Sequence, residues 1–386
     1  MSTKRRKAVK ITGIEAIAIA VPVKGSFWTS LQPMGGGKAV TELIVKVHTD
    51  DGLVGIGEGH GGPPLAAAKL IQQDLQALLL GEDPLRPEYL WHKLFAITHT
   101  RRSAWEVWGI ERGQLEVAMA AIDIALWDIV GKQAGLPLYR LLGGYTNQVP
   151  AYVTGGYYTE GRGIPELIAE CQGYVEAGFK AIKIKVGGVP LQEDVARVKA
   201  LRRTLGDDIH LMLDANRAWD VKTAIEAAQR FAEYHPRWVE EPLQWYDDIR
   251  AMTILKQNTH LPLASGESAR TRFEARELIE QRAIDILQFD GTRNGGITEW
   301  RKIAGMCSMY HVDIAPHHDP QIHGHLVAAS PNGLTVESFH NPDRDPLWPD
   351  LYAESARIEG GMLYLTERPG LGISFNDDFV RKYRQS

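Results

Sequence analysis

From about residue 145 onward, the chain alternates short apolar runs with amphipathic helical stretches. The apolar runs are AYVTGGY, AIKIKVG, IHLMLDAN, RWVEEP, LPLASGES, DILQFDG, VDIAPHH and LTVESF. Helical stretches such as DVARVKALRRTLG and VKTAIEAAQRFAEY lie between them. Alternating β and α units are typical of a parallel sheet, and eight such runs over roughly 200 residues predict a (β/α)8 barrel.

The region before the barrel has a different pattern. TELIVKVHTDDGLVGIGEG predicts two alternating strands joined by a turn at Asp50-Asp51-Gly52. Apolar spacing predicts helices over residues 65–80, 86–97 and 113–134, the last of which ends at Gly135 before Pro137. We therefore expect an N-terminal α+β region that is separate from the barrel.

Composition and charge exclude several classes of protein. The chain is 44% apolar and 24% charged, which argues against a disordered or fibrous protein. A formal net charge of −5 gives no reason to expect nucleic acid. No apolar run is long enough to span a membrane, and the basic start MSTKRRKAVK lacks the apolar stretch of a secretory signal. Two cysteines, Cys171 and Cys307, are expected to be buried thiols, which favours a cytoplasmic protein.

Three successive apolar runs end in a carboxylate. Asp214, Glu240 and Glu267 follow one another at intervals of 26 and 27 residues, about one βα unit each. A barrel brings the carboxyl ends of its strands to one face, so these side chains are expected to converge there. Converging carboxylates repel one another unless a cation lies between them, and a hard divalent ion with oxygen ligands, Mg²⁺, fits best. Side-chain alternation assigns Glu240 to the interior and its neighbour Glu241 to the opposite side.

Two candidate bases are expected on opposite sides of the same cavity. Lys183 and Lys185 alternate along one strand, so both ammonium groups point the same way, toward the ring of carboxylates. We expect Lys183 to lower the pKa of Lys185, against the opposing effect of the nearby carboxylates. Across the barrel, His317 follows Asp290 by one unit, and a carboxylate on one imidazole nitrogen fixes the tautomer and raises basicity.

Other histidines close by are given structural positions. His318 is expected to be structural or to face the rim of the site, and His323 and His325 are expected on the polar face of a helix.

Taken together, these residues resemble the enolase superfamily, in its mandelate racemase subgroup. The motifs that carry the resemblance are Lys183-Ile184-Lys185, Asp214, Glu240 in VEEP, Glu267 in GES, Asp290 in FDGTRNGGITEW, His317, Glu337, AAIDIALWDIVGKQAGLPLYRLLGG and the closing RPGLG. The match spans nearly the whole chain, with agreeing spacings throughout.

The resemblance implies a modified (β/α)8 TIM barrel over residues 141–355, an N-terminal α+β capping domain over 1–140, and a C-terminal segment, 356–386, that packs back on the cap. It implies one Mg²⁺ per active site, held by Asp214, Glu240 and Glu267. The shared chemistry is abstraction of the proton α to a carboxylate through an enediolate intermediate. Lys183 and a protonated Glu337 would stabilise the developing charge. Relatives assemble, so we expect a homo-oligomer, from dimer to octamer.

Within this subgroup, acid-sugar dehydration to a 2-keto-3-deoxy acid is the commonest outcome and is ranked first. A racemase or epimerase of an α-hydroxy acid or amino-acid derivative is the alternative. A Schiff-base aldolase leaves the three carboxylates unexplained, and a glycosidase that uses Glu240 and Glu337 leaves the lysines and the Asp–His pair idle. A non-catalytic carboxylate-binding barrel is the remote alternative.

Substrate contacts are expected from the capping loops and the barrel rim. The glycine-rich loop 24–40 is suited to close over a small-molecule carboxylate. Residues proposed to contact the substrate are Trp28 and His60, with His99, Arg101 and Arg102 as further candidates. Arg293 and Asn216 are also candidates for substrate contact: we expect Arg293 to steady the site electrostatically and Asn216 to lie just behind Asp214.

Overall fold

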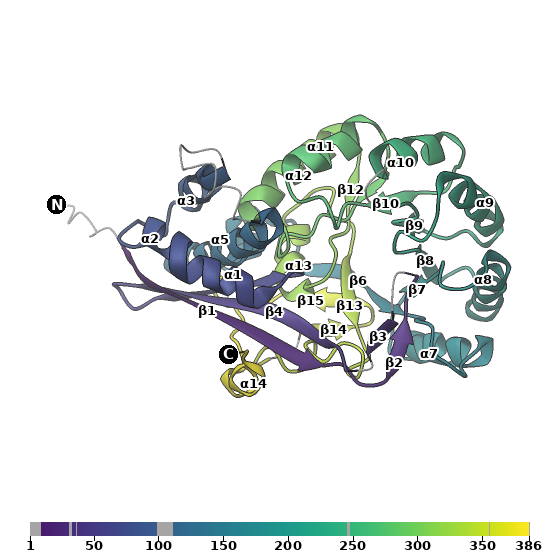
Figure 1. The fold of residues 1–386 in the computed structure, drawn as a ribbon, viewed down its shortest axis with the longest axis horizontal. Helices are drawn as coiled ribbons and strands as arrows, with labels where there is room; N and C mark the ends of the chain where they lie inside the picture. Colours follow the sequence, from purple (N-terminus) through teal and green to yellow (C-terminus); the bar gives the residue numbers. More distant parts are fainter. Residues whose placement is uncertain are drawn as a thin grey trace.

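The computed structural model describes residues 9–30, 33–35, 37–98, 111–244, 248–354 and 356–385. Its N-terminal part is an antiparallel sheet in the order β1 (Ile11–Pro22), β4 (Ala39–Thr49) and β5 (Val54–His60) (Figure 1). The predicted hairpin is therefore confirmed as β4 and β5. Helical segments cover this sheet: α1 (Pro64–Leu70), a π turn (Ile71–Leu75), α2 (Gln76–Leu79) and α5 (Arg112–Ala134). Helix α3 (Pro87–Phe95) packs on α5.

Glycines on β5 let α5 pack directly against the strand backbone. Gly55, Gly57 and Gly59 share one face because strand residues alternate. A Cβ at Gly57 would lie 2.1 Å from the carbonyl oxygen of Ala121 on α5, and one at Gly55 would lie 2.1 Å from that of Ala125. The helix ends as predicted at Gly135, which has the left-handed φ of 69° that glycine adopts without strain.

A barrel of eight parallel strands follows, as the sequence predicts. The strands are β6 (Gln148–Gly155), β7 (Ala181–Lys185), β8 (His210–Asp214), β9 (Trp238–Glu240), β10 (Leu263–Ser265), β11 (Ile286–Leu287), β12 (Asp313–Ile314) and β13 (Val336–Phe339). Neighbours in sequence pair in parallel, and β13 pairs with β6. The ring closes where the Leu334 N–H donates to the Ile314 carbonyl at 2.8 Å.

Helices ring the outside of the barrel (Figure 1). They are α7 (Ile164–Glu176), α8 (Leu191–Leu205), α9 (Val221–Phe231), α10 (Asp248–Gln257), α11 (Arg272–Glu280), α12 (Gly296–Tyr310) and α13 (Pro320–Ala328). After β13, the described residues up to 354 form turns where a regular (β/α)8 barrel has its eighth helix. The barrel is in this sense modified.

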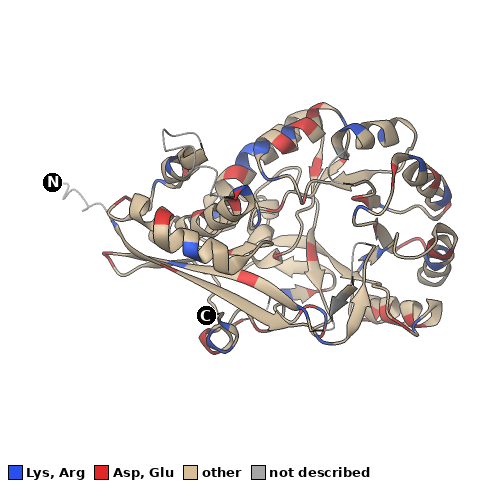
Figure 2. Ribbon diagram, viewed as in Figure 1, with Lys and Arg blue, Asp and Glu red and all other residues tan. Residues whose placement is uncertain are grey.

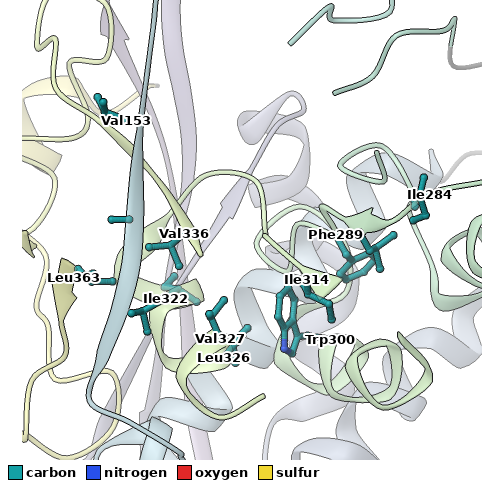
Figure 3. Packing of buried hydrophobic residues seen from close by; sticks show 14 of the residues in the cluster. Val153, Ile284, Phe289, Trp300, Ile314, Ile322, Leu326, Val327, Val336 and Leu363 are labelled. Carbon is teal, nitrogen blue, oxygen red and sulfur yellow. The ribbon is translucent and has the colours of Figure 1, made fainter. Parts of the chain in front are cut away.

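Apolar side chains fill the barrel and the layer between strands and helices. Phe289, Trp300 and Ile314 pack together in one part of that layer, and Ile322, Val336 and Leu363 in another (Figure 3). Inside the ring, one buried layer comes from the strands and their flanking residues: Tyr152, Ala181, Met212, Trp238, Ala264, Ile286 and Ala315. Because strand side chains alternate, the residues two positions further along point into the barrel again, at its carboxyl end.

The C-terminal segment divides between barrel and cap. The hairpin of β14 (Arg357–Glu359) and β15 (Met362–Tyr364) turns at Gly360-Gly361, and β15 pairs with the start of β6. Within the segment expected to pack on the cap, this hairpin instead joins the barrel, because β6 begins three residues before its pairing with β13 and offers that edge. Further along, the segment does reach the cap: the Leu371 N–H donates to Asp128 Oδ1 on α5 at 2.8 Å. At the end of the chain, beyond α14 (Asp377–Tyr383), the Gln385 N–H donates to the Ala18 carbonyl on β1 at 2.8 Å.

Both signs of charge occur on the outer helices of the barrel, without a large region of one sign in this view (Figure 2). Among the described residues, no helix is long and apolar enough to cross a membrane.

Candidate active site

Polar side chains gather at the carboxyl end of the barrel strands. Lys185, Asp214 and Glu240 are directly paired across β7, β8 and β9. Glu267 follows β10 by two residues, and Asp290 follows β11 by three. These groups are almost fully buried, as are Lys183 and Glu337. The strand ends therefore place all the predicted catalytic and metal-binding residues on one face of the barrel.

The two lysines form ion pairs with different carboxylates. Lys183 Nζ lies 2.6 Å from Glu240 Oε1 and 2.9 Å from Glu337 Oε1. Lys185 Nζ lies 2.5 Å from Asp214 Oδ2. Burial and Lys183 lower the pKa of Lys185, but Asp214 outweighs them and holds it above the ordinary value. The expected lowering by Lys183 is thus present but is not the dominant effect.

The carboxylates of Asp214, Glu240 and Glu267 fit a hard divalent cation. They come from three adjacent strands, supply only oxygen donors and are buried together. Burial, opposed by Lys183, raises the pKa of Glu240 to about 7, and Asp214 and Glu267 add to the rise. Such carboxylates resist being ionised side by side, and a divalent ion with oxygen ligands relieves that repulsion.

His317 is oriented by Asp290. Its Nδ1 lies 2.9 Å from Asp290 Oδ2, while Nε2 lies 3.7 Å from Glu267 Oε2. Burial opposes protonation of His317, but Glu267 and Asp290 outweigh it and raise the pKa to about 9. The other oxygen of Asp290 accepts the N–H of Thr292 at 2.9 Å and that of Arg293 at 3.1 Å. This carboxylate is therefore fixed by its own loop, and it fixes the imidazole in turn.

Glu337 accepts hydrogen bonds on both of its oxygens. The Thr154 hydroxyl donates to Oε1 at 2.5 Å, and the His318 N–H donates to Oε2 at 3.0 Å. Burial opposes ionisation, yet Lys183 and His317 hold the pKa of Glu337 well below its usual range. In this arrangement Glu337 accepts both hydrogen bonds and lies among cations, which favour its ionised form over the protonated form that could donate.

His60, from the cap, packs on the site through His318. The two rings are stacked at 4.0 Å between centroids, and His60 Nδ1 lies 2.9 Å from Glu42 Oε2. Burial and the neighbouring His318 lower the pKa of His60 to about 3. Burial opposes protonation of His318 too, but Asp319 at 2.8 Å raises its pKa to about 10. His318 is thus a partly buried cation beneath the cap, which is a structural position.

His60, His318 and Asp319 are a second possible metal site. Within the described part of the chain, the one group of three ligand atoms within 4.8 Å of one another is His60, His318 and Asp319. The two imidazole planes are only 13° apart, so their in-plane lone pairs do not converge on a common point. For this reason the three strand-end carboxylates remain the better cation site.

Two predicted substrate residues lie beside the metal-binding carboxylates. The Asn216 N–H donates to Asp214 Oδ1 at 2.9 Å, and its side-chain Nδ2 lies 3.3 Å from Oδ2. Arg293 Nη1 lies 3.5 Å from Glu267 Oε1. Asn216 thus holds Asp214 from behind, and the guanidinium of Arg293 lies beside Glu267.

Trp28 lies in the short hairpin of β2 (Ser26–Trp28) and β3 (Pro33–Gly35). Its ring stacks on Tyr158 at 5.9 Å, and it lines a cavity of about 450 Å³ bordered by the β6–α7 loop. The described contacts do not bring it against the strand-end groups. His99, Arg101 and Arg102 lie outside the described residues.

Three histidine and carboxylate positions differ from expectation. Glu241 was assigned away from the site, but the strand ends at Glu240 and Glu241 takes a left-handed φ of 37°. It is buried, and its Oε2 lies 3.1 Å from Arg217 Nε. His323 and His325 are fully buried rather than on a polar face. Tertiary partners explain this: His323 Nε2 accepts the Gly291 N–H at 2.9 Å, and His325 Nε2 donates to the Leu371 carbonyl at 3.1 Å.

Sequence reasoning missed several residues of the site. Arg217 lies 3.5 Å from Glu267 as well as near Glu241, and Thr292 Oγ1 lies 2.7 Å from Asp290 Oδ1 and 2.8 Å from Asp319 Oδ2. Both follow predicted strand ends within three residues, and that position was a usable signal. Thr154 precedes the end of β6 and carried no such signal.

Family models match both parts of the chain. Residues 14–143 match the mandelate racemase / muconate lactonizing enzyme N-terminal domain, and residues 166–379 match the enolase C-terminal domain-like family. A curated relative, arabinonate dehydratase of Saccharolobus solfataricus, is 37% identical over 351 residues, which cover 89% of this chain and 90% of that protein. L-talarate/galactarate dehydratase of Salmonella typhimurium is 33% identical, over 91% of this chain and 85% of that protein.

The chain is also similar to an isomerase and to a dehydratase of known crystal structure. The 3,6-anhydro-alpha-L-galactonate cycloisomerase of Streptomyces coelicolor is 32% identical over 88% of this chain and 90% of that protein. The crystal structure of L-talarate/galactarate dehydratase from Salmonella typhimurium LT2, liganded with Mg and L-lyxarohydroxamate, superposes with a TM-score of 0.87 at 29% identity, covering 100% of this chain and 95% of that one. The chain thus belongs to the mandelate racemase / muconate lactonizing enzyme family of the enolase superfamily.

Proposed function

We propose that this protein is a Mg²⁺-dependent acid-sugar dehydratase, which removes the proton α to a carboxylate and then the β-hydroxyl. The observation that carries the proposal is the arrangement at the strand ends. Lys185 on the second strand and the His317–Asp290 pair on the seventh and sixth border one cluster of buried carboxylates. Dehydration needs one base for the α-proton and one acid for the leaving hydroxyl, and the site offers two such groups.

Each proposed base has a partner that sets its orientation. Asp290 holds Nδ1 of His317, so that Nε2 is the nitrogen that faces the site and exchanges a proton with substrate. Asp214 holds the ammonium group of Lys185. One of the two removes the α-proton, and the other donates a proton to the departing hydroxyl.

The remaining groups manage negative charge. We assign one Mg²⁺ to Asp214, Glu240 and Glu267; when bound, it supplies positive charge that stabilises the enediolate. Lys183, held between Glu240 and Glu337, is a buried cation that stabilises the same charge without reorganising. Glu337 positions Lys183 and the backbone of His318.

An isomerase is the second candidate. A two-base site also removes a proton from one face and returns it to the other, and a cycloisomerase is among the relatives with similar coverage. Retention of substrate mass with exchange of one C–H bond would identify this reaction.

Proton NMR in D₂O tests the proposal. Purified protein with Mg²⁺ is incubated with separate mono- and dicarboxylic acid sugars and with simple α-hydroxy acids. New signals from a 2-keto-3-deoxy acid support dehydration and name the substrate. Loss of an α-proton signal without a new compound favours the isomerase, and spectra that stay unchanged across the whole library would contradict both candidates.

We further propose the division into a cap over residues 1–140, a barrel over 141–355 and a C-terminal segment over 356–386. The contacts of α14 with β1 support packing of the end of this segment on the cap. A cytoplasmic location and a homo-oligomeric state stay predictions from the sequence.

A further inference from the structure

The ring of Tyr157 lies beside Lys185, one of the two proposed bases. Tyr157 follows β6 by two residues, and the Lys185 Nζ atom lies 5.0 Å from the centroid of its ring. An ammonium group within about 6 Å of a ring centroid is attracted by the electron-rich face of the ring. The same Nζ atom lies 2.5 Å from Asp214 Oδ2. One aromatic and one acidic side chain therefore hold this proposed base.

The two partners of Lys185 differ in how a bound metal ion would affect them. Asp214 is a proposed ligand of Mg²⁺, so its carboxylate would share its charge with the ion and attract the ammonium group less strongly. The ring of Tyr157 has no charge to share. It packs against the lysine in either protonation state, and it attracts the charged state more strongly. This difference makes the ring the partner suited to keep Lys185 in place while the site is loaded.

Other parts of the chain fix the ring of Tyr157. The guanidinium carbon of Arg344 lies 4.2 Å from the ring centroid. Arg344 is itself buried, and its Nη2 donates to the Thr154 carbonyl at 2.7 Å. The ring of Phe27, in the cap, meets Tyr157 edge-on, with centroids 5.3 Å apart and planes at 83°, an arrangement that aromatic pairs favour. Tyr157 is thus held by partners other than Lys185.

The cap hairpin is tied to the loop that carries Tyr157. Phe27 lies on β2, and the hairpin of β2 and β3 lies beside the start of the barrel near α7 (Figure 1). The Trp28 N–H donates to the Tyr158 carbonyl at 2.9 Å, and the Tyr158 N–H donates to the Trp28 carbonyl at 3.2 Å. These two hydrogen bonds flank the contact between Phe27 and Tyr157, so the cap holds the ring against the barrel.

We propose that Tyr157 is a positioning residue for Lys185: its ring, held by Phe27 of the cap, keeps the amine where it exchanges a proton with the substrate. This inference rests on the proposed function, which makes Lys185 one of two bases. The other base, His317, is held by Asp290 instead, at 2.9 Å. Loss of the ring should therefore impair the proton transfer made by Lys185 and spare the one made by His317.

Steady-state kinetics on the substrate found by NMR test the assignment. Tyr157→Leu removes the aromatic face, and we expect kcat to fall at least tenfold while KM changes less than twofold, because displacing a reacting group by about 1 Å costs on the order of a hundredfold. Tyr157→Phe loses only the hydroxyl and should retain most of the wild-type kcat. Tyr145→Leu, at an exposed position, is the matched control and should change neither value. A Tyr157→Leu variant with the kcat of the wild type would overturn the inference.

Exchange of the α-proton with D₂O separates positioning from a general loss of structure. If His317→Asn is the variant that still exchanges, Lys185 is the base, and adding Tyr157→Leu should slow the exchange at least tenfold. If Lys185→Ala is the variant that exchanges, His317 is the base, and adding Tyr157→Leu should change the exchange less than twofold. The opposite result in either background would show that Tyr157 does not act through Lys185.

Phe27→Leu tests the contribution of the cap. It should lower kcat in the same direction as Tyr157→Leu but by a smaller factor. The double variant should be no slower than Tyr157→Leu alone, because Phe27 acts through the ring. Losses that multiply in the double variant would overturn this role of Phe27.

An NMR spectrum of the protein itself distinguishes this inference from the proposed function. In protein with isotopically labelled lysine, the ε-methylene signal of Lys185 is the one that disappears in Lys185→Ala. The ring current of Tyr157 shifts this proton signal upfield, so Tyr157→Leu should move it downfield, whereas Tyr157→Phe should leave it in place. That shift, without turnover of any acid, would support the contact and refute dehydration. Turnover with a signal that Tyr157→Leu does not move would refute the contact and leave dehydration standing.

Discussion

His317 Nδ1 lies 2.9 Å from Asp290 Oδ2, and this contact fixes which imidazole nitrogen faces the barrel interior. Asp290→Asn keeps the shape but presents either an amide N–H or a neutral oxygen to Nδ1. We expect kcat to fall on the order of a hundredfold, since a general acid or base contributes ~10²–10⁴-fold. Steady-state kinetics on the substrate found by NMR check this. Turnover close to wild type, in a variant with unchanged thermal stability, would remove Asp290 from the mechanism.

The two-base arrangement predicts unequal partial reactions. Lys185→Ala and His317→Asn should each abolish the overall reaction, because neither group can do the work of the other across the barrel. One of the two variants should still exchange the α-proton of a substrate with solvent, since the remaining base serves the opposite face. Proton NMR in D₂O follows this exchange, and normal turnover by both variants would contradict the model.

The carboxylate cluster predicts dependence on a divalent ion. Thorough chelation should abolish activity, and Mg²⁺ should restore it, because three buried carboxylates on adjacent strands offer oxygen ligands to one divalent ion. Glu267→Gln should weaken Mg²⁺ binding in calorimetry at least tenfold. Asp220→Asn, at an exposed helix cap, is the matched control and should bind Mg²⁺ as the wild type does. Full activity after chelation would refute the assignment.

Packing of α5 on β5 predicts a stability effect at a single glycine. A Cβ at Gly57 would lie 2.1 Å from the Ala121 carbonyl oxygen and 2.8 Å from the Ala125 nitrogen, so the helix must move away from the strand. Gly57→Ala should lower the free energy of unfolding by about 1–3 kcal/mol, the range for an overpacked core. Gly13→Ala, on β1, meets no atom within 4 Å and should change it by less than about 0.5 kcal/mol. Urea unfolding of both variants decides the matter, and equal stabilities would count against this packing.

The order of the barrel and the position of its polar groups followed from sequence because both are local. One strand ends in each βα unit, so the spacing of strand ends can be read from the sequence. The barrel fold alone then places a side chain at a strand end, such as Asp214 or Glu267, at the active-site face. Glu241 was assigned wrongly because its left-handed backbone ends the alternation, and nothing in VEEP marks where the strand stops.

Long-range partners explain the other differences. His325 is buried by the Leu371 carbonyl, 46 residues further along the chain. The pairing of β15 with β6 depends on a free edge that exists only once the barrel has closed. The charge state of Glu337 likewise depends on Lys183 and His317, and on the hydroxyl of Thr154, which are far away in the sequence. Periodicity carries no information on such contacts.

His325 predicts how stability changes with pH. The Tyr139 N–H donates to Nδ1 of His325 at 3.3 Å, and its Nε2–H donates to the Leu371 carbonyl. Burial lowers the pKa of His325 in the folded protein to about 4. The unfolded chain, with a histidine pKa of about 6.5, binds the proton more readily. Stability should therefore be full above pH 6.5 and fall as the pH drops toward 4, by about 3 kcal/mol for a shift of this size. Urea unfolding across this window should show a smaller loss for His325→Gln than for the wild type, whereas His92→Gln, at an exposed position, should follow the wild type. If His325→Gln loses as much stability as the wild type between pH 6.5 and 4, another group is responsible for the acid sensitivity.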